Sequence, residues 1–437
     1  MKRINNSVIA LSLLAGIMYT HAQEKKQLSL DEAVQLGIQN SKSLKIDAAK
    51  IEEATADLLE AKNRQLPELK VSGSYMYLPI KPTIDLKIPG VSSAGGPEVH
   101  QVAFGSANLS VPLYSGGRIK YGIQSAKYLV EASKLSSEND KVAIAYNVAE
   151  AYNNLFKANQ SIKVLEENLT ASQKRDETFL KLENNGVIAR NDRLKANLQT
   201  SNIELQLLEA KNNYNIANIN MDLLLGLPES TEIEVDQNYI GESDEVKTVD
   251  FYLNEAKENR KDLQALDQQR KAAELGTKSA KAENLPSIAL TGGYVAADVP
   301  KFLTLYNAVN VGVGISYNLS NLWKENSSLK QSKAREMQLS ATNELLNDNI
   351  KLDVNREYQN TDYSKKRIAV FEKSAEQANE NYRITKNKYD NGLATMTELL
   401  DADAAQIAAN VGVINAKADA SLAYRKLLQT TGTLTIK

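Results

Sequence analysis

The sequence predicts a mainly α-helical protein with a small β part, built from a duplicated unit of helix, two strands, long helix and return helix. Three observations predict this fold. Two long stretches are almost free of residues that break helices, four short stretches alternate in hydrophobicity, and the order of these elements recurs once along the chain. The 437 residues allow a large core, but the content is repetitive rather than modular.

The longest predicted helix ends at Asn391-Gly392. Neither proline nor glycine occurs between Trp323 and Asn391, and these 69 residues would form a rod roughly 100 Å long. Gly392 supplies the left-handed residue that ends a helix, and Thr395 with Glu398 has the S/T-x-x-E form of a capping box that begins a return helix. Near the end of the rod, residues spaced three and four apart predict a coiled-coil seam, and therefore a partner helix: Ile368, Phe371, Ala375, Ala378, Tyr382, Thr385 and Tyr389.

The first half begins with a predicted helix over residues 30–65, which ends before Pro67. Alternation with a period of two then predicts a strand at 71–77 and a second at 109–113. A loop rich in proline and glycine separates the two strands.

A second long helix is predicted over residues 118–185, which contain no proline and only one glycine, Gly122. It ends at Asn185-Gly186, and a return helix follows as far as Gly226. The first half therefore predicts the same helical hairpin as the second.

Matching residues show that the two halves are copies. At an offset of 219 residues, Gln65-Leu66-Pro67, Tyr75, Asn40 and Leu44 correspond to Asn284-Leu285-Pro286, Tyr294, Asn259 and Leu263. At an offset of 206 residues, Asn185-Gly186, Leu194 and Gly226 correspond to Asn391-Gly392, Leu400 and Gly432. The second copy accordingly has predicted strands at 288–294 and 309–319.

These boundaries give four parts of the chain. Residues 1–22 form an expected signal peptide, with basic Lys2 and Arg3, a short apolar run and a small residue, Ala22, before the cleavage point. Residues 23–230 are the first structural repeat and 250–437 the second. Between them, 231–249 is an acidic connector that we expect to be a solvated linker around the outside of the helices.

Composition excludes several functional classes. Removal of Lys2 and Arg3 changes the formal net charge from −2 to −4, which gives no reason to expect nucleic acid as a partner. No cysteine is present, which excludes disulfides, thiol nucleophiles and thiolate metal sites. After residue 22 no apolar run of about 18 residues predicts a membrane-spanning helix.

Four strands with apolar faces cannot close a membrane barrel alone, and open sheet edges are not tolerated in lipid. Several chains must then share one barrel. Two chains would give eight strands and a filled interior, whereas three would give twelve strands and a lumen. With the long helices attached, the expected assembly is a conduit that extends from an outer membrane into the periplasm.

The sequence resembles the TolC family of outer-membrane efflux proteins over residues 30–434. The resemblance rests on the order, within the duplicated frame, of several short strings: Leu30-Asp31-Glu32-Ala33-Val34, Val111-Pro112-Leu113-Tyr114-Ser115-Gly116-Gly117, Leu223-Leu224-Leu225-Gly226-Leu227-Pro228, Lys388-Tyr389-Asp390-Asn391-Gly392 and Glu398-Leu399-Leu400-Asp401-Ala402. It implies a homotrimer with a 12-stranded outer-membrane β-barrel continued by a periplasmic α-helical barrel of 12 helices. The implied partners are outer-membrane lipid, a periplasmic adaptor (membrane fusion) protein and an inner-membrane pump of the RND or ABC type.

The function that this resemblance implies is an outer-membrane channel of a tripartite efflux or type I secretion system, which conducts substrates passively to the exterior. The alternative from another class is a soluble periplasmic coiled-coil scaffold or adaptor protein, whose short strands would form a small packed sheet. We predict no enzyme, cofactor or metal site, because His100 is the only histidine after residue 22 and no cysteine can join it.

The turns between the long helices are the predicted functional region. Glu398 and Asp401 are three residues apart and share one face of a helix, so an inward orientation in a three-fold tube would form rings of negative charge that favour cations. The resemblance places both at a constricted periplasmic entrance, with Asp192 near it and Tyr389 helping to hold it closed. Alternatively, Glu398 only completes the capping box and Tyr389 is a coiled-coil knob.

Three further predictions concern single residues. By the resemblance, Ala394 stands where some family members have an arginine that locks the entrance, so closure here is expected to rest on other contacts. The resemblance makes the turns at Gly186 and Gly392 the contact points for the adaptor, beside their role in ending helices. Six aromatic residues in or beside the predicted strands are candidates for the girdles of a barrel, with ordinary strand packing as the alternative: Tyr75, Tyr77, Tyr114, Tyr294, Tyr317 and Trp323.

Overall fold

The computed structural model describes residues 25–80, 82, 99–237, 239–240, 245–300 and 303–435. The predicted signal peptide, most of the loop between the first two strands and part of the acidic connector lie outside the described residues. The chain divides into two compact units. One consists of Met1–Lys45, Glu138–Arg260 and Asp348–Lys437, and the other of Ile46–Ser137 and Lys261–Asn347.

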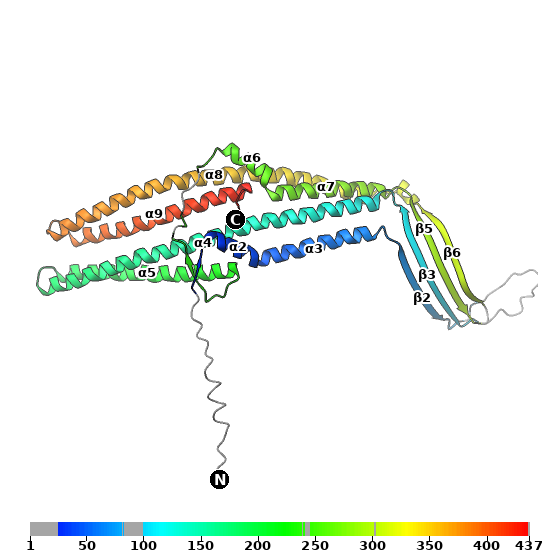
Figure 1. Cartoon of the computed structure of the whole chain (residues 1–437), viewed down its shortest axis with the longest axis horizontal. Helices are drawn as coiled ribbons and strands as arrows, with labels where there is room; N and C mark the ends of the chain where they lie inside the picture. Colours follow the sequence, from blue (N-terminus) through cyan, green and yellow to red (C-terminus); the bar gives the residue numbers. More distant parts are fainter. Residues whose placement is uncertain are drawn as a thin grey trace, which may run out of the picture. The chain divides into compact units, whose positions relative to one another are not determined.

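The elements occur in the predicted order in both halves (Figure 1). The first half contains β1 (Lys25–Leu28), α2 (Leu30–Asn40), α3 (Lys42–Asn63), β2 (Glu68–Tyr77), β3 (Gln101–Tyr114), α4 (Arg118–Asn184) and α5 (Arg190–Leu225). The second contains β4 (Glu232–Val235), α6 (Val249–Asn259), α7 (Lys261–Ala282), β5 (Ser287–Val299), β6 (Leu303–Ser316), the 3₁₀ helix η1 (Leu319–Leu322), α8 (Ser327–Asp390) and α9 (Met396–Thr431).

The structure confirms the duplication, because the residues that reveal it in the sequence meet in space. Gly226 ends α5 in the left-handed conformation, and a side chain there would collide with Asn40. Gly432 ends α9 in the same conformation, and a side chain there would collide with the backbone of Asn259. Each copy therefore closes its return helix against the end of its own first helix.

Two predicted helix boundaries are wrong. The helix expected over residues 30–65 is broken at Ser41, whose extended backbone ends α2 and whose hydroxyl accepts a hydrogen bond from the Leu44 amide (3.2 Å). The helix expected from Trp323 begins at Ser327, because Trp323 instead ends the 3₁₀ helix. The resulting α8 has 64 residues and is about 96 Å long.

The acidic connector was expected to be a solvated linker, and this expectation is wrong for its first part. Residues 232–235 form β4, which pairs in parallel with β1. Ile233 is fully buried and Val235 nearly so. Because acidic side chains alternate with these apolar ones, the segment has one wet face and one buried face.

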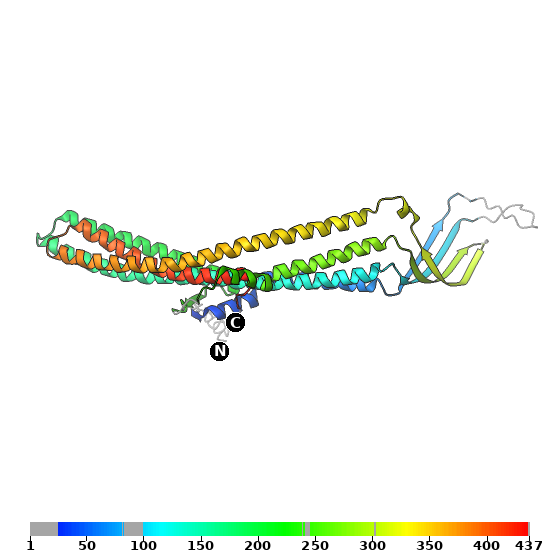
Figure 2. The ribbon, with the colours of Figure 1, turned by 90° about the horizontal axis from the view of Figure 1, so that it is seen from above.

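The first unit has its main core around the middle of α4. Tyr152 packs there with Leu155, Met221 and Leu225. Its hydroxyl donates to the Leu28 carbonyl (2.8 Å) and accepts from the Asp236 amide (2.7 Å), so it joins the segments that carry β1 and β4. In this unit α5 returns along α4, and α9 returns along α8 (Figures 1 and 2).

The predicted seam on α8 packs against α9. Phe371 lies so close to Gly412 that an added side chain would approach its ring to 2.7 Å. Ala375 is buried, and Tyr382 and Tyr389 pack into a common cluster with Met396. A glycine at position 412 therefore permits the close approach of the two helices.

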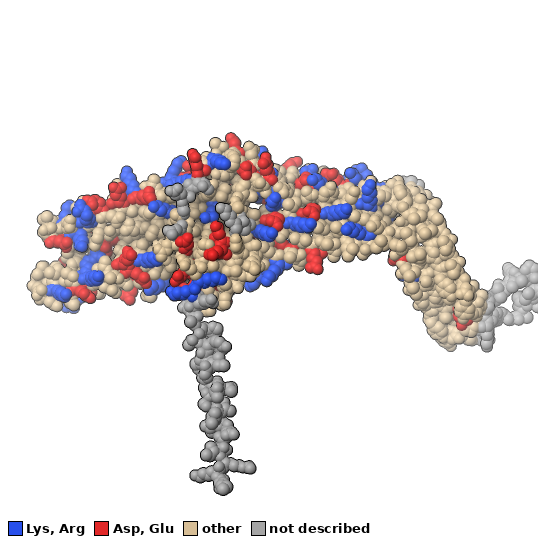
Figure 3. All heavy atoms as spheres, in the orientation of Figure 1, with Lys and Arg blue, Asp and Glu red and all other residues tan. Residues whose placement is uncertain are grey.

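The second unit contains a four-stranded antiparallel sheet in the order β2-β3-β5-β6. The helical segments of this unit are linked by hydrogen bonds, among them Ser125 to the Ala272 carbonyl (2.9 Å) and Thr277 to Glu336 (2.9 Å). The strands are longer than predicted, and the face of the sheet seen in Figure 3 carries almost no charged atoms.

Candidate functional site: the helix turns and the two-faced sheet

The two long hairpins of the first unit turn in the same way. Gly186 and Gly392 both have φ near +70° (70° and 76°), the left-handed region that favours glycine. The amide of Val187 donates to the Leu182 carbonyl, and the amide of Leu393 donates to the Lys388 carbonyl, each over 2.8 Å. Both helices thus end in a Schellman motif, which satisfies their last carbonyl groups.

The return helices begin differently. Thr395 and Glu398 form the predicted capping box, in which the Glu398 carboxylate accepts from the Thr395 amide (2.7 Å) and hydroxyl (2.9 Å). These hydrogen bonds lower the pKa of Glu398. In the first copy Ala189 occupies the capping position and provides no side-chain hydrogen bond. Glu398 therefore does complete the capping box, and its side chain is also exposed to solvent.

The other predicted gate residues lie around a small core at the turns. Phe179, Ala196, Met396 and Leu399 form this core, so residues from both hairpins contribute to it. Tyr389 packs on its edge, with its ring 5.8 Å from that of Phe179. Burial raises the pKa of Tyr389, and the nearby carboxylates of Asp192 and Asp390 raise it further.

The structure therefore brings Asp192 and Tyr389 together, but Glu398 bonds to its own helix start. Asp192 is also within 3.4 Å of Lys195. Asp401 is exposed, and Ala394 is half-buried in the turn. A ring of carboxylates requires other copies of the chain, so the gate remains a prediction.

A buried ion pair between the two hairpins was not predicted from the sequence. Arg175 on α4 donates to both carboxylate oxygens of Asp403 on α9, at 3.1 and 3.0 Å. Only 14% of the Arg175 side chain and 4% of the Asp403 side chain is exposed. Asp403 follows the buried Ala402 in the sequence. An acidic residue beside the apolar side of a helix needs a cation nearby, so this position could have indicated an ion pair.

One face of the sheet is apolar along all four strands. In register, Leu69, Leu109, Gly292 and Val311 lie side by side, and 78% of Val311 is exposed. The neighbouring rows on this face are equally apolar: Val71, Ala107, Tyr294 and Val309, then Val111, Leu290 and Val313. A contiguous exposed apolar surface of this kind marks a contact with lipid or with another protein chain.

Four of the predicted girdle residues lie at different heights on this face, and Tyr317 and Trp323 follow the sheet in sequence. Tyr114 pairs with Ile288 at one end of the sheet, and Tyr317 and Trp323 follow the end of β6 that pairs with Ile288. Tyr75 and Tyr77 lie towards the other end, where they pair with Ala103 and Gln101. Tyr294 lies between the two ends.

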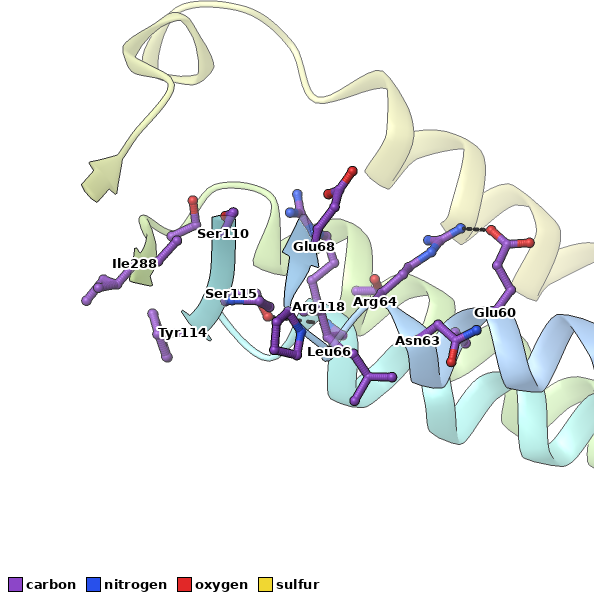
Figure 4. A pocket seen from close by; sticks show the side chains of 18 of the residues that line it. Glu60, Asn63, Arg64, Leu66, Glu68, Ser110, Tyr114, Ser115, Arg118 and Ile288 are labelled. Carbon is purple, nitrogen blue, oxygen red and sulfur yellow. Dashed lines mark hydrogen bonds and ion pairs between the residues drawn. The ribbon is translucent and has the colours of Figure 1, made fainter. Parts of the chain in front are cut away.

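The opposite face of the same strands is polar over most of its length. Lys70, Asn108, Gly293 and Asn310 form one row, and the Ser72 and Ser106 hydroxyls of the next row are 2.9 Å apart. This face leads into a hollow of about 980 Å³ at the junction with the helices. Figure 4 shows the residues around this hollow, among them Glu68 and Ser110 from the strands and Asn63, Arg64 and Arg118 from the helical side.

The described part of the chain contains no group of three or more histidine, cysteine, aspartate or glutamate side chains that could hold a metal ion. No helix among the described residues has the length and hydropathy needed to cross a membrane.

Comparison with known proteins yields one family and a set of solved structures. The family model for outer membrane efflux proteins matches residues 33–227 and 252–433, one segment in each copy. No curated protein sequence matches.

Several solved channels share the fold. The outer membrane protein VceC from Vibrio cholerae has a TM-score of 0.77 and 18% identity, with 92% of this chain and 96% of that chain covered. The outer-membrane channel OprN has a TM-score of 0.78 and 18% identity, with 92% and 89% covered. The open MtrE channel of Neisseria gonorrhoeae has a TM-score of 0.75 and 18% identity, with 93% and 90% covered. Since the family model spans most of both copies, this chain belongs to the outer membrane efflux protein family.

Proposed function

We propose that this outer-membrane protein is the exit duct of a tripartite efflux or type I secretion system. It supplies a water-filled path across the outer membrane and performs no chemical reaction. The observation that carries the proposal is the two-faced sheet, which is apolar on one side across all four strands and polar on the other side over most of its length. In a membrane barrel the apolar side faces lipid and the polar side lines the lumen.

The height of the apolar band fits a membrane. Tyr114 and Ala103, the residue that pairs with Tyr75, are 11 positions apart on β3. That distance is about 37 Å along a strand, or roughly 26 Å across a bilayer at a tilt of 45°. Outer-membrane barrels carry an apolar band about 25 Å tall between aromatic girdles, and Tyr114 with Tyr75 would mark its two edges.

The sheet must be completed by further copies of the chain, because β2 and β6 are its outer strands and lipid does not tolerate open edges. Three copies give twelve strands, which leave a lumen. The α5 helix independently supports such neighbours. It exposes an apolar stripe on the side opposite to the buried Ile203 and Leu207: Leu194, Leu198, Leu205, Leu208, Ile216, Ile219 and Leu223.

In such a trimer the long helices continue the lumen into the periplasm. The turns at Gly186 and Gly392 are the surfaces proposed to meet an adaptor protein, which couples the duct to an inner-membrane pump. The pump supplies the energy for transport, since the proposed duct is passive. Asp192, Tyr389, Glu398 and Asp401 are proposed to control the entrance.

Conductance in planar bilayers tests the channel and its gate. Wild-type protein should form cation-preferring pores, and Glu398→Gln combined with Asp401→Asn should weaken that preference and the block by multivalent cations. Glutamine can still complete a capping box, so this variant removes charge while preserving the helix start. Thr395→Ala is the matched control, because it breaks the cap and leaves both carboxylates in place.

Two results would count against the proposal in different ways. Unchanged selectivity in the charge variant would exclude Glu398 and Asp401 from the pore wall. Absence of any pore would contradict the duct itself. The scaffold alternative predicts that the protein leaves with the soluble periplasmic fraction, whereas the duct requires detergent for extraction.

A further inference from the structure

The polar face of the sheet changes character at the end that is far from Tyr114. Over three rows it carries side chains such as Lys70, Asn108 and Ser72. In the next row Ser74 is the one polar residue: it pairs with Phe104, Phe104 pairs with Ala297, and Ala297 pairs with Leu305. Beyond this row, Met76 pairs with Val102 and Val299 pairs with Leu303. The face that is polar elsewhere thus ends in a band of apolar side chains.

A β-bulge in β6 places Leu303 and Leu305 on this face. Ala308 pairs with Val295, but Leu305 pairs with Ala297, so two residues of β6 lie opposite Ala296 alone. One of the two is Asn307, which has φ 58° and is the only described non-glycine residue with a positive φ. A strand that continued without the extra residue would present Tyr306 and Thr304 here, because one inserted residue exchanges the two faces.

The same bulge gives the opposite face polar groups at this end. Thr304 pairs with Asp298, and its hydroxyl donates to the Asp298 carboxylate (3.0 Å). Tyr75 and Tyr77 lie on this side too, and the Tyr75 hydroxyl donates to Gln101 (2.7 Å). Apolar and polar groups have therefore changed faces, as expected where the outer side of a barrel leaves the lipid.

We propose that Met76, Val102, Phe104, Val299, Leu303 and Leu305 form an apolar collar inside the outer mouth of the channel, and that the Asn307 bulge builds it. This inference rests on the proposed function. Apart from the Ser74 hydroxyl, the side chains of this stretch offer no hydrogen-bond partner to a hydrated ion, so we expect the collar to reduce ion flow at the exit. Amphipathic organic solutes can instead contact it through their apolar parts, which makes the collar a determinant of what the exit passes readily.

Single-channel conductance tests the collar. Phe104→Ser combined with Leu305→Ser should raise the conductance by roughly twofold or more, with no change in the cation-to-anion permeability ratio, because no charge is altered. Phe104→Leu combined with Leu305→Ile is the matched control and should retain the wild-type conductance. Both side chains are more than one-third exposed, so these replacements leave the strand core intact.

Deletion of Asn307 tests the role of the bulge. The deletion should bring Tyr306 and Thr304 onto the lumen face and raise conductance in the same direction as the serine variant, whereas Asn307→Gly should preserve the bulge and the wild-type conductance. Trimer mass in detergent identifies a variant that fails to assemble, in which case the serine variant decides. A wild-type pore whose conductance is unaffected by the serine replacements would overturn the collar, while a wild type without pores would instead overturn the proposed function.

Discussion

The return helices α5 and α9 occupy equivalent places in the two copies and have the same length, 36 residues, yet they serve different surroundings. The outer side of α5 exposes Leu205 and Leu208. The residues 206 positions later, Val411 and Ile414, are half-buried, and Ile414 packs against the main core. The two copies thus share their backbone course, but the apolar surface of α9 is partly covered within the chain, whereas that of α5 is exposed.

The starts of the two helices differ in charge as well. Asp192 and Lys195 form an ion pair in the first copy. The equivalent residues of the second copy are Glu398 and Asp401, two acids. The negative charge proposed for the entrance would therefore come from the second hairpin, because residues 190–195 of the first hairpin carry three basic side chains and one acidic one.

The largest expected effect comes from the apolar stripe of α5. Leu205→Asp combined with Leu208→Asp should abolish the trimer, because two carboxylates would be buried without partners at the contact between chains. The mass in detergent should fall to that of one chain. Gln206→Asp adds a charge beside the stripe and should leave the trimer intact. Persistence of trimers in the double variant would show that α5 does not face a neighbouring copy.

The buried ion pair of α9 has the next largest effect. Asp403 corresponds to Asn197 of α5, which only hydrogen-bonds to the Asp176 carboxylate (3.1 Å) at the surface. Arg175→Met should cost about 3–5 kcal/mol, because it leaves Asp403 buried and unpaired. The apparent midpoint of thermal unfolding, followed by circular dichroism, measures this loss.

Two further variants make that test specific. Adding Asp403→Leu to Arg175→Met should recover most of the lost stability, since an apolar pair can replace a buried ion pair. Lys157→Met removes the ion pair of Lys157 with Asp419, which is more exposed, and should have a smaller effect. Equal losses from the two single variants would contradict the importance of burial.

The difference in helix capping predicts smaller changes in stability. Removing the cap of α9 should destabilise the protein, and adding a cap to α5 should stabilise it. Thr395→Ala should destabilise the protein by about 1 kcal/mol, because it removes the acceptor for the Glu398 amide. Ala189→Thr should stabilise the start of α5 by up to about 1 kcal/mol. Hydrogen exchange of the amides at residues 190–193 and 396–399 reports each change locally, and equal protection in all three proteins would exclude a role for the caps.

The last expected effect depends on pH and concerns the ends of the two helices. Asp222, near the end of α5, is fully buried, and it corresponds to Leu428 of α9. Burial, aided by Glu229, raises its pKa from 3.8 to about 6. Because the pKa of Asp222 is raised in the folded state, the contribution of this carboxyl group to the free energy of unfolding is complete below pH 3.8. It is lost as the pH rises towards 6, and the stability does not change further with the ionisation of Asp222 above that pH.

Comparison with Asp222→Asn isolates this contribution. The wild type should lose stability relative to the variant as the pH rises from about 4 to about 6, and the difference should then stay constant. Asparagine can still accept the hydrogen bond from Asn218 that Asp222 accepts now. Unfolding midpoints of both proteins between pH 4 and pH 8 provide the measurement, and a difference independent of pH would contradict the raised pKa.

Local features of the chain were predictable from the sequence. Gly186, Gly392 and the box of Thr395 with Glu398 act within a few residues of one another, so sequence spacing alone indicates their geometry. The duplication was predictable because the matching residues repeat at fixed offsets. The faces of the strands followed from their period of two.

Features that depend on distant partners were missed. Strand β1 pairs with β4 more than 200 residues away, and the short alternation of Glu232 to Val235 does not indicate which strand it pairs with. Arg175 and Asp403 are 228 residues apart. The bulge at Asn307 changes which face Leu303 and Leu305 occupy, and alternation in the sequence contains no record of such a shift in register.

We expect other copies of the same chain to cover the open sheet edges at β2 and β6 and the apolar stripe of α5. The mass of the detergent-extracted mature protein, corrected for bound detergent, tests it most directly. We expect three chains in each particle, because three copies give a twelve-stranded barrel with a lumen. A monomer or dimer that is soluble without detergent would contradict the duct and favour a periplasmic scaffold.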